Sequence, residues 1–113
     1  MTDCLFCRIV AGEIPADIVM RTDEVVAFRD IAPQAPVHVL VVPVDHQVNA
    51  AALAQSSPAA LAAVVDAAAA VAAVEGLDEQ YRLVFNTGAG AGQSVFHAHA
   101  HLLGGRAMTW PPG

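Results

Sequence analysis

The chain has 113 residues, a length that fits a single domain over residues 1–113 and leaves little room for a second. Its residues are 56% hydrophobic and 14% charged, which excludes a disordered chain and indicates a compact globular protein. The formal net charge is −6 and all five basic residues are scattered arginines, so we expect no binding of long nucleic acid.

Neither the start of the chain nor its longest apolar run predicts a secretory or membrane segment. The first residues carry no basic stretch followed by an apolar run. The alanine-rich run from Pro58 to Val74 is short for a membrane span, and Asp66 interrupts it. The two cysteines lie together in one CxxC, which favours a reducing compartment. We therefore expect a cytoplasmic protein with no membrane partner.

The pattern of apolar, proline and glycine residues predicts short strands with one short and one long helix. The long helix is expected to begin after Ser57 as N-cap, with Pro58 at its first position. The other expected elements are a short helix over 4–11, strands over 18–21, 25–28, 37–43, 81–86 and 95–103, a loop over 87–93 and an irregular tail over 104–113. This order predicts an α+β domain with an antiparallel sheet of about five strands.

Three alternating histidines, His97, His99 and His101, stand out in the last expected strand. Alternate side chains of a strand share one face, so the three imidazoles are expected to point the same way, roughly 6.5–7 Å apart. Such a set can hold a catalytic zinc with water in the fourth position. It can also supply a nucleophile and two neighbours that manage protons and charge. The non-functional interpretation is a partly exposed strand face on which histidines occur by chance.

The loop before the histidines favours chemistry on phosphate. Residues 87–94 read TGAGAGQS, and glycines let backbone N–H groups approach an anion closely. Because the chain has no lysine, we expect this loop to form an amide nest that cradles a phosphate. Imidazole attacks phosphorus without first losing a proton, so it suits such a site as a nucleophile.

Four residues outside the triad have both a functional and a structural interpretation. His38 is either a functional residue or a structural histidine with one hydrogen bond. Asp30 can accept hydrogen bonds from both hydroxyls of a ribose, or it can be a solvated strand end. Cys4 and Cys7 can be half of a zinc site that two histidines complete, or a pair of buried thiols. The βαβ context of a redox CxxC is missing.

Several segments resemble the histidine triad (HIT) family, and its HINT branch in particular. Residues 93–106 read QSVFHAHAHLLGGR and resemble the triad signature, while 108–113 read MTWPPG and resemble the tail of that branch. Residues 6–15 and 28–38 match the same branch, so the similarity runs from Cys4 to Gly113. The resemblance implies a HIT-like fold and a homodimer whose tails, residues 104–113, contribute to the dimer and to the active site.

The resemblance also implies roles for individual residues. His99 would be the nucleophile that takes an adenylyl group, with His97 and His101 on the phosphate oxygens and His38 behind His99, sharing its developing charge. Ser94 and Asn86 would hydrogen-bond the phosphate or the leaving nitrogen. The remaining nucleotide-binding residues would be Asp30 on the ribose, Phe6, Ile9, Ile14, Phe28 and Ile31 around the purine, and Gln93, Ser94 and Val95 in the loop.

The function implied is that of a purine nucleoside phosphoramidase, which cleaves the P–N bond of AMP or GMP amidates through an adenylyl-histidine. It needs no cofactor for the chemistry, but a structural zinc on Cys4, Cys7, His46 and His97 is expected. The alternatives are a dinucleoside polyphosphate hydrolase of the same superfamily, a non-catalytic nucleotide-binding module that regulates, and a zinc hydrolase with three histidine ligands.

Overall fold

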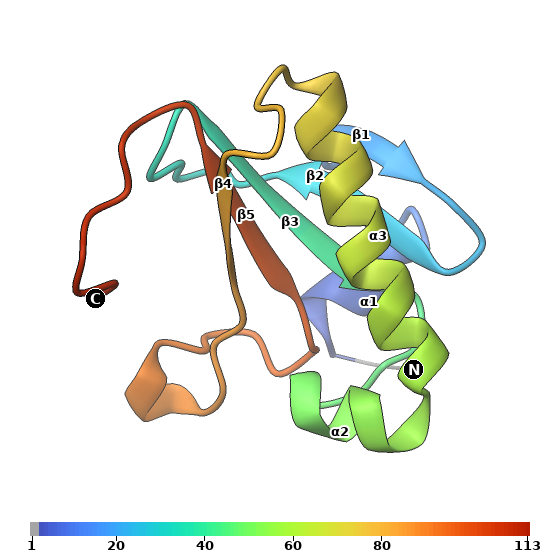
Figure 1. Ribbon diagram of the computed structural model, residues 1–113. Helices are drawn as coiled ribbons and strands as arrows, with labels where there is room; N and C mark the ends of the chain where they lie inside the picture. Colours follow the sequence, from blue (N-terminus) through green and yellow to red (C-terminus); the bar gives the residue numbers. More distant parts are fainter. Residues whose placement is uncertain (1–2) are drawn as a thin grey trace.

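The computed structural model describes residues 3–113, which form one antiparallel sheet with helices on both faces (Figure 1). The strands are β1 (Ile18–Arg21), β2 (Val25–Arg29), β3 (Val37–Pro43), β4 (Tyr81–Val84) and β5 (Ala100–Gly104), paired in the order β1-β2-β3-β5-β4. The helices are α1 (Leu5–Val10), α2 (Ala50–Ser56), α3 (Pro58–Val74) and a single 3-10 turn, η1 (Ala89–Ala91). The predicted α+β class and the five-stranded sheet are confirmed.

The central strand β3 is apolar on both faces because each face is covered by a helix. Val39 and Val41 lie in the core beneath α3, whereas Leu40 and Val42 lie in a second core with Phe6 of α1. Side chains of a strand alternate between faces, so His38 shares the α1 face with Leu40 and Val42. The face opposite α3 is therefore where the histidines of the sheet gather.

The alanine-rich region forms two helices where the sequence predicts one. The long helix α3 begins as predicted: the Ser57 Oγ accepts a hydrogen bond from the Ala60 amide at 3.1 Å, and Pro58 is the first residue. The unexpected helix α2 has its own cap, because the Asn49 Oδ1 accepts from the Ala52 amide at 2.9 Å. Ser57 separates the helices in an extended conformation, which is favoured for a residue that precedes proline.

The last strand is shorter than the predicted 95–103, and this changes how the triad is built. Pairing of β3 with β5 ends at Val41 and Ala100. The next pair to exchange hydrogen bonds across this edge would be Pro43 with Ala98, and Pro43 has no N–H to donate to the ladder. The Ala98 amide instead donates to the Gln47 carbonyl at 2.7 Å. His97 and His99 therefore precede the strand and only His101 lies within it, so strand periodicity does not orient all three rings.

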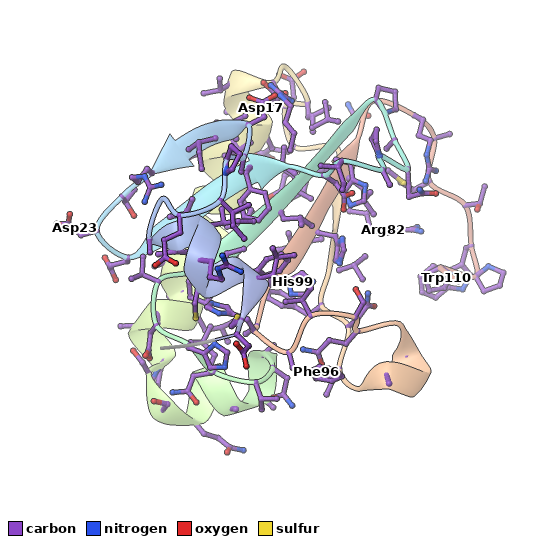
Figure 2. All side chains as sticks on the ribbon, turned by 180° about the vertical axis from the view of Figure 1, so that it is seen from behind. Asp17, Asp23, Arg82, Phe96, His99 and Trp110 are labelled. Carbon is purple, nitrogen blue, oxygen red and sulfur yellow. The ribbon has the colours of Figure 1, made fainter. Side chains whose placement is uncertain are left out.

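The tail after β5 forms no helix or strand over residues 105–113 and leaves the body of the domain (Figures 1 and 2). One hydrogen bond, from Arg82 Nη2 to the Thr109 carbonyl at 2.9 Å, ties it to β4. Trp110 is 82% exposed and lies far from His99 within the protomer. Within residues 3–113 we find no helix that combines the length and apolarity needed to span a membrane.

Candidate active site and metal cluster

His97 is fully buried, and both of its ring nitrogens are occupied. Its Nε2 lies 2.8 Å from the Pro43 carbonyl oxygen, which can only accept, so we assign the proton of the neutral ring to Nε2. Its Nδ1 therefore carries a lone pair, and this atom lies 3.4 Å from both Cys4 Sγ and Cys7 Sγ and 2.9 Å from His46 Nδ1. No ring nitrogen of His97 is left for a substrate, which argues against the implied role on the phosphate.

The predicted zinc ligands Cys4, Cys7, His46 and His97 come together in one cluster, with all four ligand atoms within 4.8 Å of one another. In a tetrahedral zinc site, Zn–S and Zn–N distances place sulfur and nitrogen about 3.6 Å apart and two nitrogens about 3.4 Å apart. The Sγ–Nδ1 distances of 3.2–3.4 Å and the Nδ1–Nδ1 distance of 2.9 Å need only a small outward movement to fit. Two thiols and two imidazoles form a donor set that suits zinc.

His99 has the opposite ring orientation to His97. Its Nδ1 lies 2.7 Å from the carbonyl oxygen of His97, so the neutral ring carries its proton on Nδ1 and a lone pair on Nε2. The ring is buried on the α1 face, where Phe6 packs edge-on against it with ring centroids 4.9 Å apart. Figure 2 shows His99 beside α1, behind the sheet as drawn in Figure 1. This geometry leaves the lone pair of Nε2 free of the hydrogen bond that holds Nδ1.

His38 lies against His101, which corrects the expectation that it lies behind His99. His38 Nε2 is 3.0 Å from His101 Nδ1 and 3.5 Å from Asp30 Oδ2. The reason is register: His38 pairs with Leu103 and Leu40 pairs with His101, so the two histidines are diagonal neighbours on one face. His101 in turn contacts His99 with ring centroids 5.0 Å apart. His38 therefore reaches the predicted nucleophile only through His101.

A second group of possible metal ligands is formed by Asp30, His38 and His101, whose ligand atoms lie within 4.8 Å of one another. The position of the His38 proton indicates a hydrogen-bond chain in place of a metal site. His38 Nδ1 accepts a hydrogen bond from the Gln34 amide at 3.0 Å, which places the proton of the neutral His38 ring on Nε2. A protonated Nε2 cannot bind a metal. It can donate to His101 and Asp30, the two groups that face it.

Burial lowers the pKa values of all three triad histidines. For His97 and His99 the loss of hydration outweighs the hydrogen bonds to carbonyl oxygens, which favour the charged form. For His101, burial and the neighbouring His99 and His38 lower the pKa to about 4, against the opposing effect of Asp30. All three rings are therefore neutral at pH 7, as a nucleophilic imidazole requires.

An apolar pocket of about 500 Å³ lies between α1 and β2, and two of its lining residues, Phe6 and Asp30, contact His99 and His38. Asp30 and the buried Leu40 of β3 are among the residues that line it. All the residues predicted to surround a purine or ribose line it: Phe6, Ile9, Ile14, Phe28, Asp30 and Ile31. Six lining residues were not predicted: Leu5, Pro15, Ala16, Asp17, Arg29 and Leu40. For Leu40 a signal was available, because strand alternation places it on the face of His38.

Part of the glycine-rich loop is not available as the expected amide nest, because several of its amides are bonded within the loop. The amides of Ala91, Gly92 and Gln93 donate to carbonyls within the loop at 3.0–3.1 Å, and the Gly88 amide donates to Gln93 Oε1 at 2.9 Å. Gln93 is buried and also donates to the carbonyls of Val48 and Val95, so it braces the loop. Glycine is required at Gly88 and Gly92 because both have positive φ angles.

Asn86, Ser94 and Val95, the other predicted residues of this region, border the loop. Asn86 lies beside Gly92, where an added Cβ would be 3.7 Å from Asn86 Nδ2. Ser94 is exposed and lines a shallow hollow with Val95, Phe96 and Cys4. Val95 packs against the α1-side core. Ser94 is thus the residue of this group with an exposed hydroxyl available to a ligand.

Comparison with known proteins agrees with this architecture. A "14 kDa zinc-binding protein" of Brassica juncea is 44% identical over 98% of this chain and 100% of its own length. "Adenylylsulfatase HINT1" of Arabidopsis thaliana is 43% identical over 96% of this chain and 76% of its own length. The crystal structure of a HIT family hydrolase from Legionella pneumophila superposes with a TM-score of 0.93 at 50% identity, covering 98% of this chain and all of that one. The family model of the HIT domain matches residues 11–108, and the chain belongs to this family.

Proposed function

We propose that the protein hydrolyses the P–N bond of a purine nucleoside phosphoramidate through a covalent adenylyl-His99 intermediate. The observation that carries the proposal is the hydrogen bond from His99 Nδ1 to the His97 carbonyl. This bond leaves a lone pair on Nε2 of a ring that packs against Phe6, a residue of the apolar pocket. The name of the Legionella protein, a HIT family hydrolase, supports hydrolysis, and the name of the Arabidopsis protein, an adenylylsulfatase, supports a reaction on an adenylyl group.

The nucleotide would bind with its base in the pocket of Phe6, Phe28 and Ile31 and its ribose hydroxyls on Asp30. This arrangement brings the α-phosphorus toward the histidines at the edge of the pocket. His99 Nε2 forms a bond to phosphorus as the P–N bond breaks, and the leaving amine takes a proton from solvent. Water then attacks phosphorus, the bond to Nε2 breaks, and AMP leaves while one proton returns to solvent.

Two other groups would act on the phosphate in this reaction. Neutral His101 hydrogen-bonds a phosphate oxygen, and the Ser94 hydroxyl binds another oxygen or the leaving nitrogen, with Asn86 beside it. His97 acts through its backbone, because its carbonyl holds the Nδ1 proton of the nucleophile. Zinc bound by Cys4, Cys7, His46 and His97 would be structural, since it would fix His97 and would not contact the substrate.

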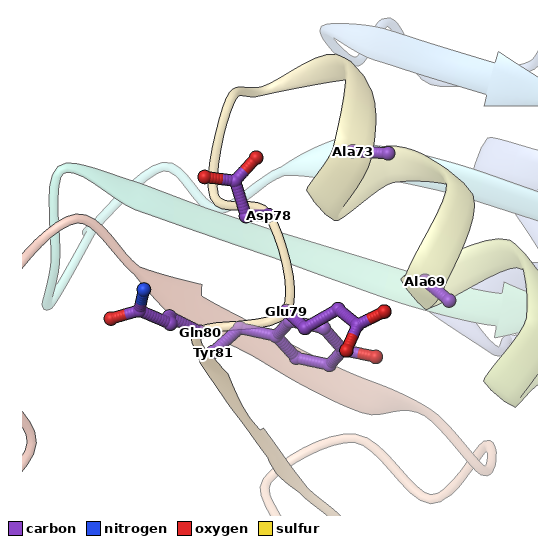
Figure 3. A pocket seen from close by; sticks show the side chains of 6 residues that line it. All are labelled: Ala69, Ala73, Asp78, Glu79, Gln80 and Tyr81. Atoms are coloured by element: carbon purple, nitrogen blue, oxygen red, sulfur yellow. The ribbon is translucent and has the colours of Figure 1, made fainter.

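The edge strand β4 supports assembly of the protein as a homodimer. The strand β4 ends the sheet, so one of its edges has no partner strand within residues 3–113. Beside it lies an open hollow of about 830 Å³ between α3 and the start of β4, lined by Ala69, Ala73, Asp78, Glu79, Gln80 and Tyr81 (Figure 3). A second copy can cover this region, and the exposed tails with Trp110 can then reach across to the partner's site.

The test is hydrolysis of a fluorogenic adenosine phosphoramidate by the wild type and by His99→Ala, each with and without a chelator. Adenylyl sulfate and a dinucleoside polyphosphate serve as competing substrates. We expect wild-type turnover that survives chelation, falls roughly 10³-fold or more in the variant, and leaves one adenylyl group on the His99 peptide when quenched. Absence of turnover by the wild type would refute the proposal in favour of a binding module. Loss on chelation with no adenylylated peptide would indicate the zinc hydrolase.

A further inference from the structure

The direction of the hydrogen bond between His38 and His101 follows from a backbone group. The Gln34 amide can only donate, and it lies 3.0 Å from His38 Nδ1. His38 Nδ1 must therefore carry a lone pair, which leaves Nε2 as the protonated nitrogen of the neutral ring. The acceptors that face this proton are His101 Nδ1 at 3.0 Å and Asp30 Oδ2 at 3.5 Å.

The proton position of His101 follows from that of His38. Because His38 Nε2 donates, His101 Nδ1 accepts and the proton of neutral His101 lies on Nε2. The low pKa of His101 is consistent with a ring that stays neutral in this arrangement. His99, with ring centroids 5.0 Å away, has its proton on Nδ1 and its lone pair on Nε2. The two neighbouring rings therefore differ at Nε2: this atom carries a lone pair in His99 and a proton in His101.

The loop that carries the Gln34 amide, residues 30–36, is held from two directions. Within the loop, Gln34 Nε2 donates to the Ala32 carbonyl at 2.9 Å, and the Ala32 amide donates to Asp30 Oδ1 at 2.8 Å. From the chain beyond β5, Arg106 Nε donates to the Gln34 carbonyl at 3.0 Å. Gly105 lies so close to Pro36 that an added Cβ would be 3.0 Å from Pro36 Cβ. These contacts fix the peptide planes on both sides of Gln34.

We propose that the backbone amide of Gln34 is a positioning group that sets the proton direction of the His38–His101 pair, so that His101 presents an N–H at Nε2 to the substrate. The identity of the acceptor, a phosphate oxygen, rests on the proposed function. With the direction reversed, His101 would present a lone pair, and a lone pair repels an anionic oxygen. The proton direction therefore selects between stabilising and destabilising the phosphate.

The proton positions are measurable by long-range ¹H–¹⁵N correlation spectra of protein labelled with ¹⁵N-histidine, recorded on the wild type, Gln34→Pro and Gln34→Ala. Gln34→Pro removes the N–H. Gln34→Ala keeps the N–H and removes only the side chain, so it is expected to keep the wild-type pattern. In the wild type we expect protons on Nε2 of His38 and His101. In Gln34→Pro we expect mixed tautomers at both rings and a kcat lower by roughly 10- to 100-fold, with a smaller change in KM.

The wild-type spectrum alone overturns the proposal if His38 or His101 carries its proton on Nδ1, and this holds even if Gln34→Pro does not fold. A folded Gln34→Pro variant that retains both tautomers also overturns it. If the wild type shows the expected tautomers but hydrolyses no phosphoramidate, the proposed function fails while the proton direction is supported. If turnover is normal and the tautomers are reversed, this inference alone fails.

Discussion

The contact between Gly104 and Leu77 provides the sharpest test of how β5 is held. Gly104 ends the strand, and Leu77, which follows α3, is buried against it. An alanine Cβ at Gly104 would lie 2.8 Å from Leu77 Cδ2 and 3.1 Å from Cγ, with Cδ1 closer still. Overpacking of this kind costs about 1–3 kcal/mol. Alanine recovers about 0.4–1 kcal/mol by restricting the unfolded chain. We expect Gly104→Ala to lower the free energy of unfolding by about 1–2 kcal/mol.

Urea and thermal unfolding followed by circular dichroism measure this loss, which corresponds to about 4–8 °C in Tm for a domain of this size. The matched control is Leu77→Val, which removes both δ carbons that crowd the new Cβ. In the double variant the two costs should combine to less than their sum, with a coupling of about 1 kcal/mol. A Gly104→Ala protein as stable as the wild type, or strictly additive costs, would refute the packing argument.

Three further predictions concern the cluster, the histidines and the assembly. Chelation is expected to lower the Tm of zinc-loaded wild type by roughly 10 °C, since a ligand at 100 times its Kd contributes about 2.7 kcal/mol. The Tm of a Cys4→Ser/Cys7→Ser variant should not change on chelation. An equal change in both proteins would contradict the assigned ligands. Because the pKa of His101 falls from 6.5 to about 4 on folding, the unfolded chain binds more protons between these values, so stability measured by urea unfolding should fall as pH drops through this window. His101→Gln should make that pH dependence shallower, and an unchanged slope would count against the lowered pKa. In light scattering, Ala73→Glu beside β4 should yield monomers while Ala51→Glu on α2 should not, and two dimeric variants would exclude this face as the interface.

The parts of the fold that the sequence predicts well are those with a local chemical signal. The start of α3 follows from Ser57 and Pro58, which form a cap and a first helical position within two residues. The strands 18–21 and 37–43 are predicted with the bounds they have in the structure, because turn residues limit them on both sides. The helix α2 was not predicted, although the residue that caps it, Asn49, is a local signal of the same kind.

The end of β5 could not be predicted in the same way, because it is decided by a residue far away in the sequence. His97 and His99 fit the alternation of a strand, yet the ladder stops at Ala100 since Pro43 on the neighbouring strand has no amide proton. The pairing of His38 with His101 likewise depends on the register between β3 and β5. By contrast, the resemblance to a known family identified the lining of the pocket, because that information lies in residue identities and not in geometry.

Three identical side chains acquire three different chemical characters because each ring has a different partner. The Pro43 carbonyl turns the lone pair of His97 toward Cys4 and Cys7, where a metal can use it. The carbonyl of His97 leaves the lone pair of His99 on Nε2, the nitrogen that the proposed attack requires. His101 Nδ1 accepts a hydrogen bond from His38 Nε2, so the proton of the neutral His101 ring lies on its own Nε2. Carbonyl oxygens and one backbone amide, which no sequence motif records, thus suit three histidines of one row to the roles of ligand, nucleophile and donor in the proposed reaction.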